Sequence, residues 1–259
     1  GAIASNGEPS FIKILDLLRL TLKEPTAENI NDIIDHFQIE NITDSRACAI
    51  AAGKVLEQGK ILGRQKNIDF TDQIWLPVVW EVHKKPWFMP FRLTMIDEAQ
   101  DLNAAQLQLS INICNPKNSI GVYVGDPFQS VFGFSGADCD SWSKIVKANN
   151  AIEMPLSVCY RCGKEHIKLV NELFPDIPIK AYEDNHDGEI IQIKEDDLDK
   201  YLYKGARNIM VIARKTAPLV SQCIKLISRG IPAQVKGRDI GQTLVREVEV
   251  ITKIQGFTW

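Results

Sequence analysis

The feature that most constrains this chain is a short apolar run, residues 93–96, that ends on two adjacent acids, Asp97 and Glu98. A short and bounded run of this kind predicts a buried strand. A carboxylate at the end of such a strand contributes little to stability, but it is well placed to hold a hydrated Mg²⁺ ion against a phosphate. A second carboxylate beside it can orient or deprotonate an attacking water.

The same acids also have a plainer explanation, in which they only precede and cap a helix. Residues 104–113 carry apolar side chains at helical spacing, and either Asp101 or Asn103 can serve as the N-cap. A second apolar run, residues 119–124, is followed at once by a polar loop that contains Asp126. Two strands that each end in an acid and a polar loop indicate a parallel sheet with its chemistry at the carboxyl edge.

Three segments carry a family resemblance. Residues 97–101 (Asp-Glu-Ala-Gln-Asp) resemble motif II, the Walker B element, of the UvrD/Rep/PcrA-like superfamily 1 DNA helicases. Residues 124–137 resemble motif III of that family, and residues 155–161 resemble motif IV, usually written Leu-x-x-Asn-Tyr-Arg. Because the segments occur in the family's order and at plausible spacing, together they are far more specific than any one of them.

The resemblance implies ATP and Mg²⁺ as cofactors and assigns roles to five residues. Asp97 is expected to hold Mg²⁺, and Glu98 to activate the attacking water. Gln129 is expected to contact the γ-phosphate, and Arg161 to stabilise the charge that develops on it. Tyr160 is expected to pack on the adenine. We expect Asp97, Glu98, Gln129 and Arg161 to line one cleft between two sheet domains.

Aromatic residues in and after motif III predict contacts with single-stranded DNA. The resemblance places Phe134 in the base-stacking position, where many relatives have Trp, and Phe132 and Trp142 are further candidates. Stacking of a base on an aromatic ring contributes about 1–3 kcal/mol and tolerates any sequence. Ser135 stands where relatives usually have Arg. Arg214, after the apolar run 208–213, is either a nucleotide or interdomain contact or a salt-bridge residue.

Motif IV departs from the family pattern at two positions. Cys159 replaces the usual Asn, and Cys162 replaces the usual Ser. With His166 these residues imitate a zinc knuckle, but the only further downstream cysteine is Cys223, and structural zinc requires four ligands. The chain has six cysteines and no signal peptide, which predicts free thiols in a reducing cytosol and a cytoplasmic protein.

The predicted fold class is α/β, with two partial RecA-like parallel-sheet domains preceded by a helical subdomain. Helical spacing over 11–22, 28–37 and 44–62 predicts the helical subdomain, residues 1–66. Residues 67–153 are then a partial first RecA-like domain with motifs II and III. Residues 154–259 are a partial second RecA-like domain with motif IV.

Smaller elements complete this prediction. Residues 67–77 have helical spacing, with Asp69 or Thr71 as a candidate N-cap and with Phe70 and Trp75 expected in the core. A buried strand is expected at 208–213, a helix at about 218–228, and a further short strand within 230–237.

Charge and hydropathy narrow the classes of partner. The net charge of −3 and the sequence pI near 5.9 argue against a protein held on duplex DNA mainly by bulk positive charge. They are compatible with a local groove for single strands. No apolar run approaches the ~18 residues that a membrane span requires.

A phosphate-binding P-loop is absent from the sequence, because Gly53-Lys54 and Gly59-Lys60 lack the required spacing and the following Ser or Thr. We therefore expect an internal fragment of a longer helicase that by itself hydrolyses ATP negligibly. The leading hypothesis is an ATP-driven translocase on single-stranded DNA, 3′ to 5′ by family analogy. One alternative is a non-catalytic nucleic-acid-binding module that kept the fold. Another is a helicase–nuclease fusion, but the sequence contains no carboxylate cluster typical of a nuclease.

Overall fold

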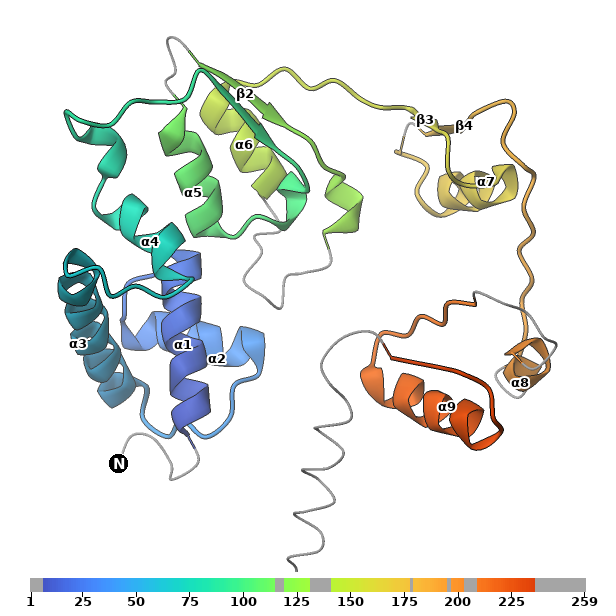
Figure 1. Ribbon diagram of the computed structural model, residues 1–259, viewed down its shortest axis with the longest axis horizontal. Helices are drawn as coiled ribbons and strands as arrows, with labels where there is room; N and C mark the ends of the chain where they lie inside the picture. The colour runs from blue at the N-terminus through green and yellow to red at the C-terminus, as the bar shows by residue number, and fades with distance from the viewer. Residues whose placement is uncertain are drawn as a thin grey trace, which may run out of the picture. The chain divides into compact units, whose positions relative to one another are not determined.

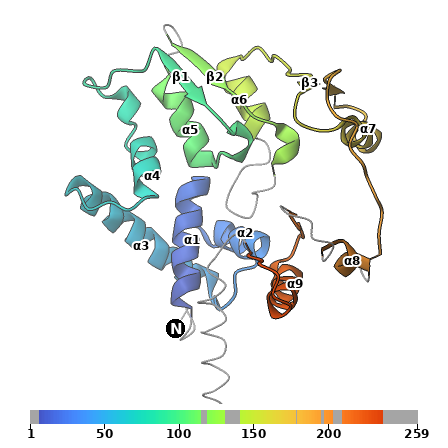
Figure 2. The same cartoon turned by 45° about the vertical axis from the view of Figure 1, so that its right-hand side comes forward.

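The computed structural model describes residues 7–114, 119–130, 141–177, 179–194, 197–202 and 209–235. The chain divides into two compact units, Gly1–Pro155 and Leu156–Trp259, and each is described by itself (Figures 1 and 2). The predicted boundaries of the three domains stay a prediction.

The first unit begins with three helices, α1 (Glu8–Thr21), α2 (Ala27–Phe37) and α3 (Ser45–Arg64). Side chains cap two of them: the Thr26 hydroxyl accepts a hydrogen bond from the Asn29 N–H, and the Asp44 carboxylate accepts from the N–H groups of Arg46 and Ala47. Such caps satisfy backbone donors that have no partner inside the helix. The predicted helices are confirmed, with ends that differ by a few residues.

These three helices share one hydrophobic core. Apolar residues three and four apart on each helix face inward, so that burial rather than intrinsic propensity stabilises the group. Ile14, Leu18 and Ile30 are fully buried at its centre. The other buried members are Leu17, Ile33, Ile39, Cys48, Ala49 and Ala52.

Helix α4 (Asp72–Val79) is tied to α1 by an ion cluster on Arg19. The Arg19 guanidinium donates hydrogen bonds to Asp16 (2.5 Å), Asp69 (2.7 Å) and Asp72 (2.8 Å). Thr71 occupies the N-cap position of α4 without a capping bond, and the Asp69 carboxylate accepts from the Asp72 N–H instead. Of the two candidate caps, Asp69 supplies the hydrogen bond. A short 3₁₀ helix, η1 (Val82–Lys84), follows α4.

The rest of the first unit contains a two-stranded parallel sheet and the helices beside it. Strand β1 (Leu93–Ile96) pairs with β2 (Ile120–Tyr123), with Leu93 opposite Ile120 and Ile96 opposite Tyr123. Between them run the 3₁₀ helix η2 (Ala99–Asp101) and helix α5 (Ala104–Ile113), and after them come η3 (Pro127–Gln129) and α6 (Ser141–Asn149). Figure 2 shows α5 and α6 beside the two strands. This confirms a parallel sheet with helical connections, as the α/β class predicts.

The expectation that β1 is buried is wrong. Leu93 is 54 % exposed and Met95 is 71 % exposed, while Thr94 and Ile96, on the other face, are half-buried. Ile96 and Tyr123 pack on a second core cluster made of Ala99, Leu107 and Ile145. An apolar strand is buried on both faces only where both faces of its sheet are covered. Among the described residues, helices cover one face of this sheet.

The second unit is smaller in regular structure. Strand β3 (Val158–Cys159) pairs in parallel with β4 (Lys180–Ala181), and helix α7 (Lys164–Leu173) contacts β4. Two further helices follow, α8 (Leu198–Leu202) and α9 (Thr216–Ser228). The predicted helix near 218–228 is therefore confirmed. The RecA-like character of both predicted sheet domains stays a prediction beyond this mixed arrangement of helices and small parallel sheets.

Three sequence predictions fail in the described ranges. Residues 209–213 form no strand, and Met210 (77 %) and Ile212 (80 %) are exposed, because hydrophobicity alone does not supply a partner strand. Residues 231–235 form no strand either, and 236 and 237 lie outside the described residues. Phe70 is 88 % exposed rather than in the core, whereas Trp75 is buried as expected.

None of the helices built by the described residues combines the length and the apolar character needed to cross a bilayer.

Candidate active site

The two acids of motif II lie where β1 ends, and the backbone turns sharply between them and η2. The Asp97 carboxylate accepts a hydrogen bond from the Glu98 N–H (2.9 Å). Glu98 has φ 52° and ψ 42°, the left-handed conformation that a non-glycine residue adopts at a cost of about 1–2 kcal/mol. Both side chains are exposed, so they are accessible to a ligand in solvent.

A buried glutamine joins motif II to the loop after β2. Gln100 is 2 % exposed, and its Nε2 donates to the Glu98 Oε2 at 2.7 Å. Its Oε1 accepts from the Asp126 N–H at 3.0 Å. Burial of both ends of an amide is favourable only when both are hydrogen-bonded, and here they are. The Gln100 side chain therefore fixes the position of the Glu98 carboxylate relative to the motif III loop.

Asp126 continues this chain of hydrogen bonds to Gln129. Its Oδ1 accepts from the Phe128 N–H at 3.0 Å, and its Oδ2 accepts from the Gln129 Nε2 at 2.7 Å. The bond to Phe128 makes Asp126 the N-cap of η3, which begins at Pro127. We call Asp97, Glu98, Gln100, Asp126 and Gln129 the carboxyl-edge relay, because its hydrogen bonds connect the ends of β1 and β2. The structure thus brings together three of the predicted site residues, Asp97, Glu98 and Gln129.

A close approach at Gly125 makes the relay possible. A Cβ atom at this position would lie 2.3 Å from the Gln100 Oε1 and 3.0 Å from the Ala99 backbone nitrogen. Any other residue would displace the buried amide. The Ala99 N–H donates to the Val124 carbonyl at 2.9 Å, which holds the two loops at this spacing.

The first residue of helix α6 contacts the backbone that carries the relay. The hydroxyl of Ser141, which is 1 % exposed, donates to the carbonyls of Gln100 (3.1 Å) and Ala99 (3.4 Å). These carbonyls belong to η2, in which the Ala99 carbonyl also accepts from the Leu102 N–H at 3.5 Å. Ser141 therefore anchors the backbone on which Gln100 is carried.

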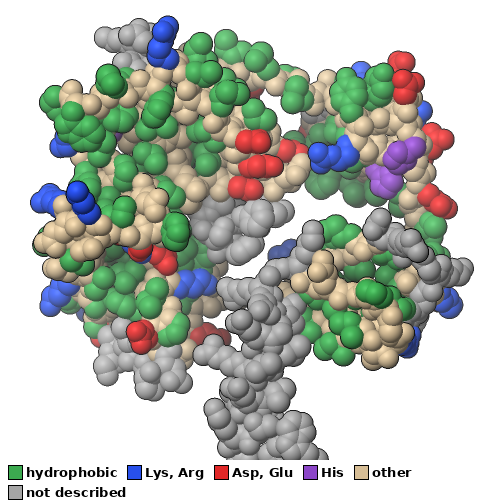
Figure 3. Space-filling view, viewed as in Figure 1, with side chains coloured by type: hydrophobic (Ala, Val, Ile, Leu, Met, Phe, Trp, Pro, Cys, Tyr) green, Lys and Arg blue, Asp and Glu red, His purple; other side chains and the backbone are tan. Residues whose placement is uncertain are grey.

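Acidic side chains gather on the visible face of this unit beside the carboxyl ends of β1 and β2 (Figure 3). Within the described ranges, no three His, Cys, Asp or Glu side chains converge as a closed metal cage. A hydrated Mg²⁺ ion needs fewer protein ligands, because it keeps several waters and is held by one or two carboxylates together with substrate phosphates. The exposed Asp97 carboxylate at the end of β1 fits that requirement.

Tyr160 and Arg161 belong to the second unit, where they follow β3 in a bend. The Tyr160 ring is 70 % exposed and packs on the Tyr182 ring, with centroids 4.8 Å apart. Arg161 is exposed, and so is Arg214, which precedes α9. The predicted roles of these three residues stay predictions.

The aromatic residues proposed for DNA stacking divide into two groups. Phe132 and Phe134 lie outside the described residues. Trp142 is half-buried on α6, where it packs against the second core cluster and its Nε1 donates to the Glu153 carboxylate at 2.7 Å. Phe128, in η3, is 60 % exposed. Trp142 therefore has a structural role in addition to any contact with a base.

Gln100 and Ser141 are absent from the residues singled out in the sequence, although both shape the relay. A signal for Gln100 was present, because it is the uncharged polar residue inside an acidic motif and a glycine stands at the facing loop. Ser141 had no such signal. It looks like an ordinary residue at the start of a helix, and its buried contacts depend on the tertiary fold.

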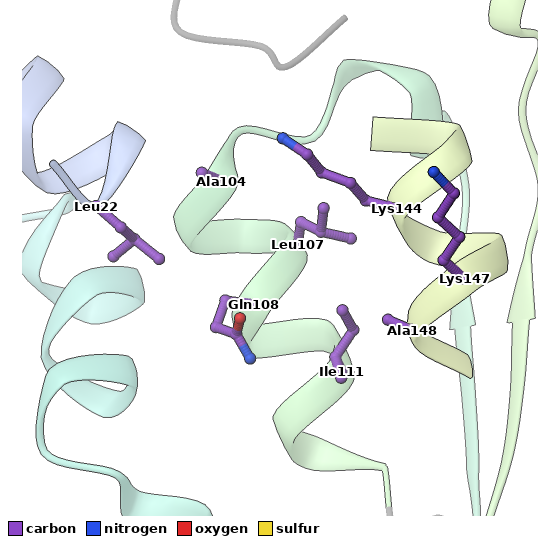
Figure 4. Close-up of a pocket in the computed structure, with 8 residues that line it drawn as sticks. All are labelled: Leu22, Ala104, Leu107, Gln108, Ile111, Lys144, Lys147 and Ala148. Atoms are coloured by element: carbon purple, nitrogen blue, oxygen red, sulfur yellow. The ribbon is translucent and has the colours of Figure 1, made fainter. Parts of the chain in front are cut away.

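A separate groove lies between α5, α6 and the end of α1 (Figure 4). Leu107 and Ile111 line it from α5, Leu22 lies at its α1 end, and Lys144 and Lys147 line it from α6. The groove includes none of the relay residues, so it is distinct from the candidate active site.

Residues 13–150, which carry motifs II and III and the whole relay, match the family model of the UvrD/REP helicase N-terminal domain. The chain belongs to this helicase family. This confirms the resemblance drawn from the sequence motifs. A stretch of 96 residues is also 28 % identical to the RecBCD enzyme subunit RecB of Borreliella burgdorferi. That similarity covers 36 % of this chain, and the chain spans 8 % of the length of the RecB subunit.

Proposed function

We propose that the complete protein is an ATP-dependent DNA helicase that couples ATP hydrolysis to 3′-to-5′ movement along single-stranded DNA. The observation that carries this proposal is the carboxyl-edge relay, which links the acids of motif II to the glutamine of motif III within a domain of the UvrD/REP helicase family. The relay contains carboxylates suited to ATP hydrolysis. It also includes Gln129, which precedes the aromatic residues proposed to stack on DNA bases.

In this mechanism Glu98 orients and deprotonates the attacking water. Its carboxylate is held by the Gln100 amide, and its backbone is fixed by the left-handed turn, so its position is set before substrate arrives. Gln129 lies one hydrogen bond from Asp126. Exchange of that bond for one to the γ-phosphate would transmit the state of the nucleotide to the relay.

Asp97 is the residue that would hold Mg²⁺. When bound, the ion supplies charge neutralisation at the β- and γ-phosphates. The Glu98 N–H donates to one oxygen of the Asp97 carboxylate and orients it beyond the end of β1.

In the second unit, Arg161 would stabilise the charge on the transferred phosphoryl group, since a guanidinium is always charged and donates in a planar fork. Tyr160 would pack on the adenine, and Arg214 would contact the nucleotide or the neighbouring domain. Phe134, with Phe132 and Trp142, would stack on bases of the single strand. The proposed protein is cytoplasmic. Its proposed domains are a helical subdomain (residues 1–66), a partial first RecA-like domain (67–153) and a partial second RecA-like domain (154–259).

The test uses protein expressed from the complete open reading frame. We expect ATP hydrolysis that is stimulated by single-stranded DNA, and unwinding of a duplex with a 3′ tail but not of one with a 5′ tail. Glu98→Gln keeps the Gln100 contact geometry and removes the base, so it should lower kcat by about 10²-fold or more with little change in DNA affinity. Lys168→Gln, on the exposed face of α7, is the matched control and should leave both values unchanged.

The alternative of a non-catalytic nucleic-acid-binding module predicts a different result. Such a module would bind single-stranded DNA with no ATP hydrolysis above that of the Glu98→Gln variant. Unwinding from a 5′ tail would contradict the proposed direction while leaving the helicase assignment intact.

A further inference from the structure

Two cysteines stand at the ends of the bend that carries Tyr160 and Arg161. Cys159 is half-buried at the end of β3, and Cys162 is exposed just before α7. Both are free thiols. They flank the two motif IV residues directly, so any bond between them would close a ring around those residues.

The bend brings the Cys159 sulfur to the backbone of Cys162. The Cys162 N–H donates to the Cys159 Sγ at 3.5 Å, so the Cys159 sulfur lies against the backbone of Cys162. A disulfide requires a short separation in space between the two Cα atoms, about 4.4–6.8 Å, and side chains that point toward each other. The backbone bend at residues 160–162 and the contact of the Cys159 sulfur with the Cys162 N–H provide the short separation.

A third side chain braces this arrangement. The Asn185 Nδ2 donates to the Cys159 carbonyl at 2.7 Å and to the Cys162 carbonyl at 2.9 Å. One amide therefore holds the backbone of both cysteines. The brace comes from a turn far along the chain, so the tertiary fold of the unit maintains the approach of the two thiols.

We propose that Cys159 and Cys162 form a reversible dithiol–disulfide site, oxidised by small disulfides such as glutathione disulfide. The site does not depend on the helicase activity proposed above. In a reducing compartment such a pair is expected to be transiently oxidised and redox-sensing rather than permanently bonded.

The chemistry balances as two thiol–disulfide exchanges. The Cys159 thiolate attacks one sulfur of glutathione disulfide, which forms a mixed disulfide and releases one glutathione thiolate. Cys162 then loses its proton and its sulfur attacks the Cys159 sulfur, which releases the second glutathione. Two protein thiols are oxidised to one disulfide, and one glutathione disulfide is reduced to two thiols.

The environments of the two sulfurs fit these roles. Hydrogen bonds from the backbone N–H groups of Cys162 and then Arg161 lower the pKa of the Cys159 thiol, which favours the attacking thiolate. The hydrogen bond to Cys159 raises the pKa of the Cys162 thiol, so this residue stays protonated until the second step.

Trypsin offers a direct test, because it cleaves after Arg161 and thus between the two cysteines. The whole chain is equilibrated with glutathione disulfide, quenched with acid, alkylated and digested. We expect peptides 148–161 and 162–164 to be joined in one species that separates on reduction with dithiothreitol, and the intact mass to fall by two hydrogen atoms. Protein kept in dithiothreitol should give both peptides alkylated and separate.

Four variants sharpen the result. Cys159→Ser and Cys162→Ser should each abolish the joined species, whereas Cys223→Ser, which alters another free thiol of the same unit, should retain it. Asn185→Ala should lower the joined fraction severalfold at a fixed glutathione ratio, because the brace is lost.

The proposal is overturned if excess glutathione disulfide leaves both thiols alkylatable. It is overturned equally if stable mixed disulfides with glutathione accumulate on both cysteines, or if the joined peptides involve a different cysteine. Retention of zinc by the purified chain, with both thiols protected until a chelator is added, would replace the redox assignment by a metal site. The wild-type digest needs no variant, so a folding defect in a serine variant does not affect it.

Discussion

At the scale of single residues, the candidate active site depends on one place where the chain has no side chain. Gly125 lets the motif III loop approach the buried Gln100 amide, and the resulting hydrogen bonds position Glu98 and Asp126. The ordinary backbone preferences of glycine are not the reason for its presence. The reason is the small distance to the neighbouring loop.

Substitution of this glycine should therefore be costly. Gly125→Ala places a methyl group 3.0 Å from the Ala99 backbone nitrogen, which cannot move like the end of a side chain. We expect the free energy of unfolding to fall by about 1–3 kcal/mol. Urea denaturation followed by circular dichroism measures it.

The matched control is Gly59→Ala within α3, where a Cβ would meet nothing within 4 Å. Alanine is the better helix former, so this variant should gain about 0.5–1 kcal/mol. Equal effects of the two substitutions would show that Gly125 is not constrained by the facing loop.

The pair of acids and Gln129 could be placed from the sequence, because strands that end in acids place them at one edge of a parallel sheet. The bridge through Gln100 could not, since periodicity says which residues face inward but not which buried amide finds partners. Phe70 failed for a related reason. Its apolar character predicted burial for Phe70 as for Trp75, and only Trp75 is buried.

At the scale of elements, helices α1 and α4 are held together through a charged cluster rather than apolar packing alone. The Arg19 side chain is 12 % exposed and contacts three carboxylates. Burial opposes its charge, but the hydrogen bonds to Asp69 and Asp72 outweigh this and raise the Arg19 pKa. Removal of one partner from such a cluster leaves uncompensated charges in a half-buried site.

Arg19→Met should accordingly destabilise the first unit by about 3 kcal/mol, although methionine preserves much of the apolar stem. The same substitution at Arg46, which is exposed near the start of α3, should change stability by less than about 0.5 kcal/mol. Thermal unfolding of both variants beside the wild type decides the matter. A small effect at Arg19 would mean that the cluster contributes no more than a surface ion pair.

The cluster also predicts a dependence on pH. Partial burial acts to raise the pKa of Asp69, but hydrogen bonds from the Asp72 N–H and from Arg19 outweigh it and lower that pKa. Because the folded-state pKa lies below the unfolded value, the stabilisation is present above about pH 4 and is lost as the pH falls through the folded pKa. Stability measured between about pH 5 and 2 should therefore decline less steeply for Asp69→Asn than for the wild type.

Asp32→Asn serves as the comparison, because Asp32 forms an exposed ion pair with Lys23 at 3.1 Å. Its pH profile should follow the wild type closely. Parallel profiles for Asp69→Asn and the wild type would contradict the assignment to Asp69.

The predicted helices were found because their periodicity and caps agree. Asp44 precedes α3 and caps it, and Asn103 forms a reciprocal capping box with Gln106 at the start of α5. The run at 209–213 had hydrophobicity without such local support, and its strand is not present. Strands need partners, and no pattern within one segment specifies where a partner lies.

At the scale of the whole molecule, the chain forms two compact units that meet in sequence at residues 155 and 156. The connecting stretch 151–157 forms no helix or strand, and Ile152 (88 %), Met154 (84 %) and Leu156 (89 %) are exposed. Exposed backbone without regular hydrogen bonding is a preferred site of proteolysis.

Low doses of chymotrypsin should therefore cleave after Leu156, since Pro155 blocks cleavage after Met154, before they cleave within α1–α5. Mass spectrometry of the early products should show a fragment that ends at residue 156 and resists further digestion within its helices. First cleavage inside α1–α5 would show that this division does not reflect independent stability.

The orientation of the Gln100 amide has one further consequence. An amide presents a donor at one end and an acceptor at the other, so the contact between Glu98 and the Asp126 backbone has a fixed polarity. A glutamate of the same shape would place two negative groups against each other, and a leucine would leave both neighbours unsatisfied. Among side chains of this length, glutamine is the residue that can complete the connection in both directions.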